Sequence, residues 1–391
     1  MLVQNFIYDH PDIFSNEKER IDKTGEMILF FNSIFGKYPF HQEKYGHAMA
    51  PMGGGMEHQT MTTLQNFNFD LVAHELAHQW FGDNVTCGTW QDIWINEGFA
   101  SYSEYLAREY LLGLPEAIAW MENAHSYALR ETEGRVYLTE EEAKNVTRIF
   151  SFPLSYKKGA AILHMLRNEI WDDELFFSIF REFQDRYDDS IATGEDFLSL
   201  VNELSGGDYR WFFDQWYYGK GFPVIQAVWK QRADSLYIET WQGSSSNDPE
   251  FFRMHVDFLI TFANGRDSLL RVLIDKPEKH YSFNIDKRLV NIQLDPYTKN
   301  LMNSSLYEYI PENQLVEVWP NPFSDSLNLD FQDRGSEKKV FISSLQGRIV
   351  YKETLGKRAS AEIDLSDLAA GMYLLIIEQS GKRNATRLLK L

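Results

Sequence analysis

Residues 70–100 read DLVAHELAHQWFGDNVTCGTWQDIWINEGFA, and the first part of this stretch has apolar residues at helical spacing. Within it, His74 and His78 lie four residues apart, so on an α-helix both imidazoles project from one face, close enough to share one ion. Neutral imidazole suits zinc, and Glu75 would stand beside such an ion, where a general base takes a proton from water. Taken alone, the pattern also fits a solvated His/Glu face of a helix.

A second acidic residue, Glu97, begins the next predicted helix, with eighteen residues between it and His78. By itself it fits a helix N-terminal acid that the helix dipole stabilises. A catalytic zinc, however, takes three protein ligands and keeps one position open. Together these residues predict one Zn2+ ion held by His74, His78 and Glu97.

This constellation resembles the hallmark of the zinc aminopeptidases of the aminopeptidase N type, in the gluzincin group, in which a histidine pair is followed after eighteen residues by a third-ligand glutamate. The resemblance extends over about residues 16–300. It implies a thermolysin-like, mainly α zinc peptidase domain that hydrolyses the N-terminal peptide bond of peptides.

Two further motifs support the resemblance. The run Gly54-Gly55-Met56-Glu57-His58 is similar to the family's G-x-M-E-N signature, which implies that this strand lies along the substrate and that Glu57 holds the free α-amine. A carboxylate facing a cationic amine would select substrates by their free end. His58 stands where the family has Asn, and before the resemblance the glycine run fits a flexible turn equally well.

Residues 155–163, SYKKGAAIL, are similar to the family segment that carries an oxyanion-binding tyrosine, which assigns that role to Tyr156. A phenol can stabilise an oxyanion by donating a hydrogen bond. Without the matching segment, Tyr156 would be taken as an ordinary core aromatic.

The periodicity predicts a multidomain α+β chain. Helical spacing covers residues 16–35, 70–82, 96–112, 157–171, 176–187 and 195–204, whereas alternation begins at residue 224, with strands predicted at 224–229, 235–241, 258–262 and 269–273. After a predicted linker at 303–313, further strands are predicted at 315–318, 327–331, 340–343, 348–353 and 372–378. We therefore expect a catalytic domain at 1–221, a small β-sandwich at 222–310 and an all-β domain at 311–391.

The charge is uneven along the chain. It has 57 acidic and 38 basic residues, a net charge of -19, yet from residue 313 onward it has 11 basic and 10 acidic residues. The acidic excess thus belongs to the first 312 residues, and such a field repels phosphate backbones, so nucleic acid is not an expected partner. The single cysteine, Cys87, excludes an intramolecular disulfide, and no apolar run is long enough to predict a transmembrane segment.

The last 75 or so residues resemble the sorting domain of the type IX secretion system of Bacteroidota. The resemblance rests on Trp319-Pro320-Asn321-Pro322-Phe323-Ser324, on residues 368–376, LAAGMYLLI, and on a basic ending. It implies an immunoglobulin-like fold, the type IX machinery as a partner and a secreted or cell-surface location. The predicted hairpins alone would also fit an adhesive or carbohydrate-binding module.

The N-terminus lacks the basic and apolar regions of a signal peptide, and only 73 residues precede His74, too few for the N-terminal β domain of the family. We therefore expect an N-terminally truncated form of a longer secreted enzyme. Two alternatives stay open: a catalytically impaired surface-binding protein, and a hydrolase that uses the same zinc site on non-peptide substrates such as epoxides.

Several other residues are expected to be structural. Cys87 has no activating base beside it, and His164 is expected to be a satisfied helix histidine on an apolar run. The tryptophans are expected to pack in the core, among them Trp80, Trp90, Trp94, Trp211 and Trp216.

Overall fold

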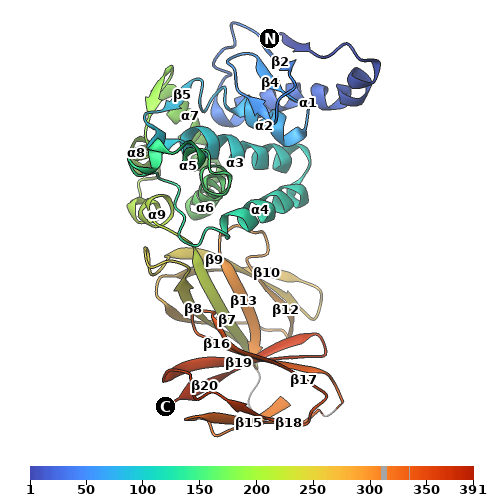
Figure 1. Cartoon of the computed structure of the whole chain (residues 1–391), viewed down its shortest axis with the longest axis vertical. Coiled ribbons are helices and arrows are strands. Elements are labelled where there is room, and N and C mark those ends of the chain that lie inside the picture. The colour runs from blue at the N-terminus through green and yellow to red at the C-terminus, as the bar shows by residue number, and fades with distance from the viewer. Residues whose placement is uncertain (310–314, 334) are drawn as a thin grey trace. The chain divides into compact units, whose positions relative to one another are not determined.

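The computed structural model describes residues 1–309, 315–333 and 335–391. The chain forms two compact units, one of Met1–Gly221 with Tyr297–Leu301 and the other of Phe222–Pro296 with Met302–Leu391 (Figure 1). The first unit is mainly helical and the second consists of β-strands, as the change of period at residue 224 predicts.

The helices of the first unit confirm the predicted ones and add α4 and the short α5 and α9. They are α1 (Pro11–Phe35), α2 (Phe69–Ala77), α3 (Trp94–Leu111), α4 (Leu114–Ala128), α5 (Val146–Ile149), α6 (Gly159–Ile170), α7 (Asp173–Arg186), α8 (Gly194–Ser205) and α9 (Arg210–Phe213). Four further helical turns are η1 (Trp90–Asp92), η2 (Glu142–Lys144), η3 (Phe152–Lys158) and η4 (Asp214–Tyr218). The helix predicted to run to Gly82 is shorter, because after Ala77 the backbone amides of Gln79 and Trp80 bond three residues back and close a tight turn.

A small sheet that the sequence did not predict lies beside α2. Its order is β1 (Val3–Phe6), β2 (Tyr45–Met49), β4 (Thr62–Leu64) and β3 (Gly55–Met56), and only β3, at the edge, is antiparallel to its neighbour. A second small pair joins β5 (Val85–Cys87) to β6 (Ser190–Ala192). The first sheet places the 54–57 segment next to the helix that carries His74.

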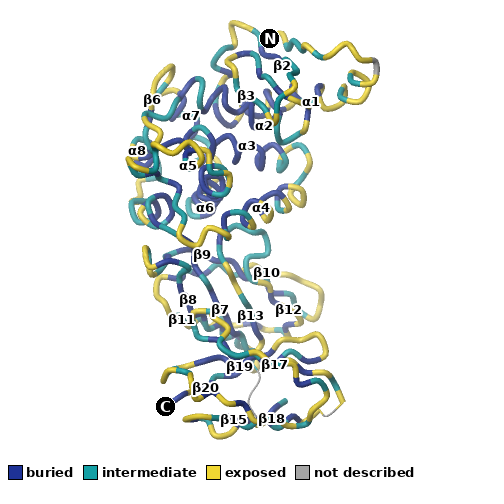
Figure 2. Tube along the Cα trace, in the orientation of Figure 1, coloured by how far each residue is buried: buried dark blue, intermediate teal, exposed yellow. Residues whose placement is uncertain are grey.

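Aromatic side chains form the core of the helical unit. The ring of Phe81 lies 4.9 Å from the rings of both Phe35 and Phe99, which join α1 to α3. Most of α2 and α3 is buried (Figure 2). Among the tryptophans, Trp80, Trp94 and Trp216 are buried as predicted, whereas Trp211 is half-buried and Trp90 is 53% exposed, so the prediction is wrong for Trp90.

Two glycines allow α3 and α6 to meet closely. A Cβ atom built on Gly98 would lie 3.2 Å from the Cα of Gly159, closer than packed side chains normally come. Because neither residue has a side chain, the backbone that carries Glu97 can lie directly against the backbone that follows Tyr156.

The second unit consists of three sheets. Its strands are β7 (Pro223–Arg232), β8 (Ser235–Ser244), β9 (Met254–Phe262), β10 (Asp267–Ile274), β11 (Glu278–Asn284), β12 (Leu289–Leu294), β13 (Asn303–Tyr309), β14 (Val316–Trp319), β15 (Ser326–Phe331), β16 (Lys338–Ser344), β17 (Ile349–Gly356), β18 (Ser360–Asp364), β19 (Gly371–Gln379) and β20 (Lys382–Lys390). The sheet orders are β10-β9-β12, β14-β15-β18 and β11-β8-β7-β13-β20-β19-β16-β17.

The linker predicted at 303–313 is wrong for residues 303–309. This segment is β13, which pairs in parallel with β7 and, through Glu308 and Tyr309, with β20. Only Tyr307 of this strand is buried, and its residues form no long apolar run, so the sequence gives little sign of a strand here. The rest of the predicted linker, residues 310–313, lies outside the described residues.

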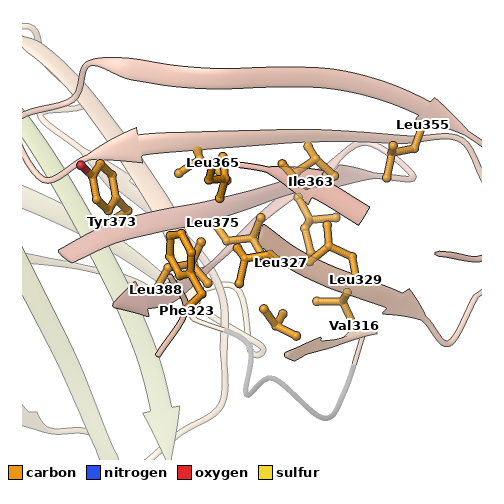
Figure 3. Packing of buried hydrophobic residues seen from close by; sticks show 14 of the residues in the cluster. Val316, Phe323, Leu327, Leu329, Leu355, Ile363, Leu365, Tyr373, Leu375 and Leu388 are labelled. Atoms are coloured by element: carbon orange, nitrogen blue, oxygen red, sulfur yellow. The ribbon is translucent and has the colours of Figure 1, made fainter. Parts of the chain in front are cut away.

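The C-terminal strands have an apolar core of their own. Figure 3 shows side chains of β14, β15 and β18 packing against those of β16, β19 and β20, with Leu327, Leu329 and Leu375 fully buried between the two layers. No helix among the described residues combines the length and the apolar character needed to cross a membrane.

Candidate metal centre

Helix α2 presents the two predicted histidines. The side chain of Asn68 caps its N-terminus by accepting hydrogen bonds from the amides of Asp70 and Leu71. The helix ends at Ala77, yet His78 keeps helical dihedral angles and donates its amide to the His74 carbonyl at 3.2 Å. The imidazoles therefore stay one turn apart, with their Nε2 atoms separated by 3.1 Å.

Glu97 joins the pair from the first turn of α3. Its Oε2 lies 3.4 Å from the Nε2 atom of His74 and 3.4 Å from that of His78. All three side chains are buried. The structure thus brings the three predicted ligands together, with their donor atoms at the corners of a small triangle.

The opposite ring nitrogens decide what the Nε2 atoms can do. The Nδ1 of His78 lies 2.9 Å from the carbonyl oxygen of Phe81, and the Nδ1 of His74 lies 2.9 Å from the Oε1 of Glu104. A carbonyl and a carboxylate only accept, so in the neutral rings Nδ1 carries the proton and both Nε2 lone pairs point toward each other and toward Glu97.

This donor set fits a zinc ion. Three lone pairs that converge at 3.1–3.4 Å repel one another unless a cation lies among them. Ligands about 2.0–2.2 Å from a tetrahedral ion lie about 3.3–3.6 Å apart, close to the spacing of the triangle. Two imidazole nitrogens and one carboxylate oxygen are also ligand types that zinc takes.

The electrostatics point the same way. Burial lowers the pKa of His74, but hydrogen bonds with Glu104 and Glu97 outweigh it and raise that pKa to about 10. Burial also lowers the pKa of His78, but the negative charge of Glu97 outweighs burial and raises that pKa to about 9. Although burial acts against it, the positive charge of the histidines holds the pKa of Glu97 well below its ordinary value. The site is therefore built to hold positive charge.

Glu75 lies beside the triangle rather than in it. It is buried, and its Oε2 has no hydrogen-bond partner among the described residues. Burial raises the pKa of its carboxyl group above the ordinary value. Gly55 of β3 packs directly on it, since a Cβ atom at that position would lie 2.5 Å from the Oε1 of Glu75. A carboxylate so placed can accept a proton without first breaking an ion pair.

The predicted substrate segment reaches the same place. Glu57, Glu75 and His78 each offer one atom within 4.8 Å of the others. Gly55 and Met56 pair with β4, and the carbonyl of Glu57 accepts a hydrogen bond of 3.2 Å from Gln79. His58, which stands where the family has Asn, lies 2.9 Å from the Oγ1 of Thr63.

Tyr156 lies on the π-helical turn η3, immediately before α6. Its ring stacks on that of His74, with centroids 5.8 Å apart and planes 14° apart. Burial and the negative charge of Glu97 raise the pKa of the phenol far above its usual range, so the hydroxyl stays protonated and can donate. The predicted ligands, Glu75, Glu57 and Tyr156 therefore lie around one point.

The sequence reasoning missed a buried network behind His74. Glu104 accepts from the Nε1 of Trp120 at 2.8 Å and lies 3.2 Å from the Nζ of Lys157, while its other oxygen faces His74. Burial alone would raise the pKa of Glu104, but Lys157 and His74 outweigh burial and hold that pKa below its ordinary value. Glu104 stands seven residues after Glu97, two turns along the same helix face, and that spacing could have found it.

Cys87 takes no part in this arrangement. Burial raises the pKa of its thiol to about 12, so it is not a thiolate nucleophile at neutral pH. This agrees with the expectation that it is structural.

Comparison with known proteins gives relatives of the helical unit. The chain is 31% identical over 297 residues to aminopeptidase N of Lactococcus lactis, covering 73% of this chain and 33% of that protein. It is 35% identical over 178 residues to aminopeptidase M1-B of Oryza sativa, covering 44% of this chain and 20% of that protein. The chain spans about a third or less of the length of these curated relatives.

A solved structure has a similar fold. It is that of Legionella pneumophila aminopeptidase A in complex with aspartic acid, with a TM-score of 0.62 and 18% sequence identity, covering 79% of this chain and 37% of the other. The likeness shows an aminopeptidase-like fold, with a helical part and a large β part.

Two family models match the chain. Residues 317–390 match the secretion system C-terminal sorting domain, in agreement with the predicted resemblance. Residues 19–216 match the peptidase family M1 domain, and they include the whole histidine and glutamate cluster. With half of its length matched in this way, the chain belongs to peptidase family M1.

Proposed function

We propose that this chain is a zinc aminopeptidase that removes N-terminal residues from peptides, with one ion held by His74, His78 and Glu97. The observation that carries the proposal is the convergence of their donor atoms at 3.1–3.4 Å, with both Nδ1 atoms already engaged. When bound, zinc supplies a Lewis acid and lowers the pKa of water.

Glu75 is proposed as general base and then general acid. Its unpartnered, buried oxygen and raised pKa suit a group that takes a proton from the attacking water and returns it to the leaving amine. Its place next to His78 supports this role because the proton has only a short distance to travel.

The substrate contacts are proposed from the neighbouring elements. Glu57 would hold the free α-amine, and the backbone of Gly54, Gly55 and Met56 would lie along the peptide. Tyr156, protonated and stacked beside His74, would donate to the oxyanion. Removing a single donor of this kind costs about 2.7–4 kcal/mol of transition-state stabilisation.

A panel of aminoacyl anilides with free and acetylated amines tests the proposal. The zinc-loaded chain should cleave the free-amine compounds only, and Glu57→Gln should reduce that preference. Equal cleavage of both forms would refute the amine-anchoring role of Glu57. No cleavage by a zinc-loaded sample would favour a surface-binding protein, and turnover of epoxides alone would favour the non-peptide hydrolase.

We also propose that the C-terminal strands form an immunoglobulin-like sorting domain that engages type IX secretion machinery and directs the protein to the cell surface or outside the cell. The separate core of β14 to β20 and the family match support it. The domain limits proposed are 1–221 for a thermolysin-like catalytic domain, 222–310 for a β-sandwich and 311–391 for the sorting domain. Export of a reporter fused to residues 311–391 in a bacterium with type IX secretion tests the sorting role, and retention of that reporter in the cell would contradict it.

A further inference from the structure

Gln79 lies in the tight turn that follows α2, and its side chain is fully buried. The amide oxygen accepts hydrogen bonds from the Thr60 amide at 2.8 Å and from the Tyr38 hydroxyl at 3.3 Å. The amide nitrogen donates to the Glu57 carbonyl at 3.2 Å and to the Asp83 carboxylate at 2.7 Å. Both donor and both acceptor positions of this amide are therefore in use, and it can face only one way round, because the Thr60 N–H only donates and the Glu57 carbonyl only accepts.

Not every buried polar side chain of the helical unit is satisfied in this way. Both ring nitrogens of His164 are buried without a hydrogen-bond partner among the described residues, so the expectation of a satisfied helix histidine is wrong. The bonds of Gln79 are costly to break, because a buried group that loses its partner does not regain the hydrogen bonds that water would give it. Gln79 therefore holds the groups around it firmly.

One of these groups belongs to a strained turn. The Met61 amide donates to the His58 carbonyl at 2.9 Å, and within this turn Thr60 has a φ of 62°, a left-handed conformation that a β-branched residue rarely adopts. Lys44 donates to the Thr60 carbonyl at 3.3 Å, so side chains bind both backbone groups of this residue. A strained conformation persists only where the surrounding structure holds it, and Gln79 and Lys44 do so here.

The same side chain ties Glu57 to the metal centre. The pairing of β3 with β4 ends at Met56, so the sheet does not extend to Glu57, and the Glu57 carbonyl binds Gln79 instead. Gln79 directly follows His78, and Glu57 and His78 offer atoms within 4.8 Å of each other. One buried amide thus connects the backbone of the proposed amine anchor to the backbone that carries a proposed zinc ligand.

We propose that Gln79 is a positioning residue that sets the distance between Glu57 and the metal centre, and with it the choice of the peptide bond next to the free amine. This inference rests on the amine-anchoring role proposed for Glu57. The amine nitrogen and the carbonyl carbon of one amino acid lie only about 2.5 Å apart, so a shift of Glu57 by about 1 Å is large on this scale. Gln79 acts through Glu57 and not on the substrate, since its own polar positions are all taken.

A metal-binding probe with and without a free amine measures this distance requirement: leucine hydroxamate and its N-acetyl derivative. In both, the hydroxamate would bind the zinc, but only the first offers a cationic amine to Glu57. Calorimetric titration of the full zinc-loaded chain should give leucine hydroxamate a Kd at least about tenfold lower than that of the acetylated form. The ratio of the two Kd values is called the amine preference below.

Gln79→Met keeps the length of the side chain and removes its hydrogen bonds, so it should lower the amine preference at least about fivefold. Zinc affinity, measured by competition with a chelator, should stay within about twofold of that of the unmodified chain. Gln184→Met is the matched control. Gln184 is also a buried glutamine, at 5% exposure, but it bonds the Trp80 carbonyl and Asn84 rather than residues 57–60, so its variant should keep the amine preference.

A double variant separates positioning from a general structural effect. Glu57→Gln removes the anchoring charge, and adding Gln79→Met to it should lower the amine preference no further, because Gln79 acts through Glu57. Two independent losses would instead multiply. If Gln79→Met does not fold, Gln79→Asn, whose amide is one methylene too short to reach both Thr60 and Glu57, is tested in the same way.

Equal binding of the two probes by the unmodified chain would refute the amine anchor of the proposed function and this inference with it. A clear amine preference that Gln79→Met leaves unchanged, or that falls equally in Gln184→Met, would overturn the inference alone. The inference would also be wrong if Gln79→Met lost zinc as well, or if the two losses multiplied in the double variant.

Discussion

Replacing Glu104 by Gln tests whether the network behind His74 sets the affinity of the metal centre. The carboxylate receives three donors: His74 Nδ1 at 2.9 Å, Trp120 Nε1 at 2.8 Å and Lys157 Nζ at 3.2 Å. Glutamine has the same shape but one oxygen and one NH2 group, so a donor must face a donor. If the NH2 group turns toward His74, the ring is forced into the tautomer whose Nε2 carries a proton and cannot bind a metal.

The magnitude follows from two separate losses. Removing a group that orients a metal ligand weakens metal binding about 10- to 100-fold, which is about 1.4–2.7 kcal/mol. Leaving the ammonium of Lys157 buried without its counter-ion costs about 3–5 kcal/mol of folding free energy. We expect a cost near the lower end of this range, because the ammonium also lies 4.3 Å from the ring of Trp120 and 5.0 Å from that of Phe152, and both rings attract a cation.

A zinc competition titration with a chromophoric chelator measures the first loss, and urea unfolding measures the second. The double variant Glu104→Gln/Lys157→Met should regain most of the stability but not the zinc affinity, because only the buried charge is removed. Glu109→Gln is the control: it lies five residues further along α3 and bonds Arg167 instead of His74. If Glu104→Gln bound zinc within about twofold of the unmodified chain, or if the double variant regained full affinity, the positioning role of Glu104 would be wrong.

Three further outcomes are expected. Glu75→Gln should lower the rate of anilide cleavage about 10²- to 10⁴-fold with zinc affinity kept, and full activity in a zinc-loaded sample would refute the general-base role. Lys158 is buried and donates to the carbonyls of Gly134 and Gly221, and burial, then Arg148, lowers its pKa to about 7. At this site the unfolded chain therefore binds more protons between about pH 7 and 10, so the stability of the unmodified chain relative to Lys158→Met should rise with pH there, whereas the raised pKa values of His74 and His78 act equally on both chains. This relative rise should reach up to about 1.4 kcal/mol per pH unit in urea unfolding, and parallel curves of the two chains would contradict it. Leu329→Ala should cost the β unit about 2–5 kcal/mol by opening a cavity in the core of Figure 3, while zinc affinity, measured by titration, stays unchanged.

The clustering of His74, His78 and Glu97 could be predicted because the information for it is local. His74 and His78 share one helix, and α2 and α3 are neighbours along the chain, so the spacing alone brings Glu97 near. Most of the helices could be predicted for the same reason, because the apolar spacing that marks a helix lies within its own residues. The end of α2 was missed because it depends on a turn in which His78 bonds the Phe81 carbonyl, and this turn leaves no periodic signal.

Features that depend on distant partners could not be predicted. The sheet of β1 to β4 draws its strands from segments separated by α1, and β13 finds its partners in β7 and β20, which lie far from it in sequence. His164 shows the same limit in a single side chain. Its apolar helix run predicts burial correctly, but whether a buried imidazole finds a hydrogen-bond partner depends on which other elements reach it.

The π-helical turn at Phe152–Lys158 has a consequence for chain length in this segment. A π turn holds about one residue more than an α turn, and each residue of a helix advances about 100° around its axis. Deleting one residue from 152–155 would let the turn relax to an ordinary α-helix, with α6 still anchored where Gly159 meets Gly98. The phenol of Tyr156 would then swing away from His74, so natural variants of this enzyme are expected to keep the number of residues in this segment constant.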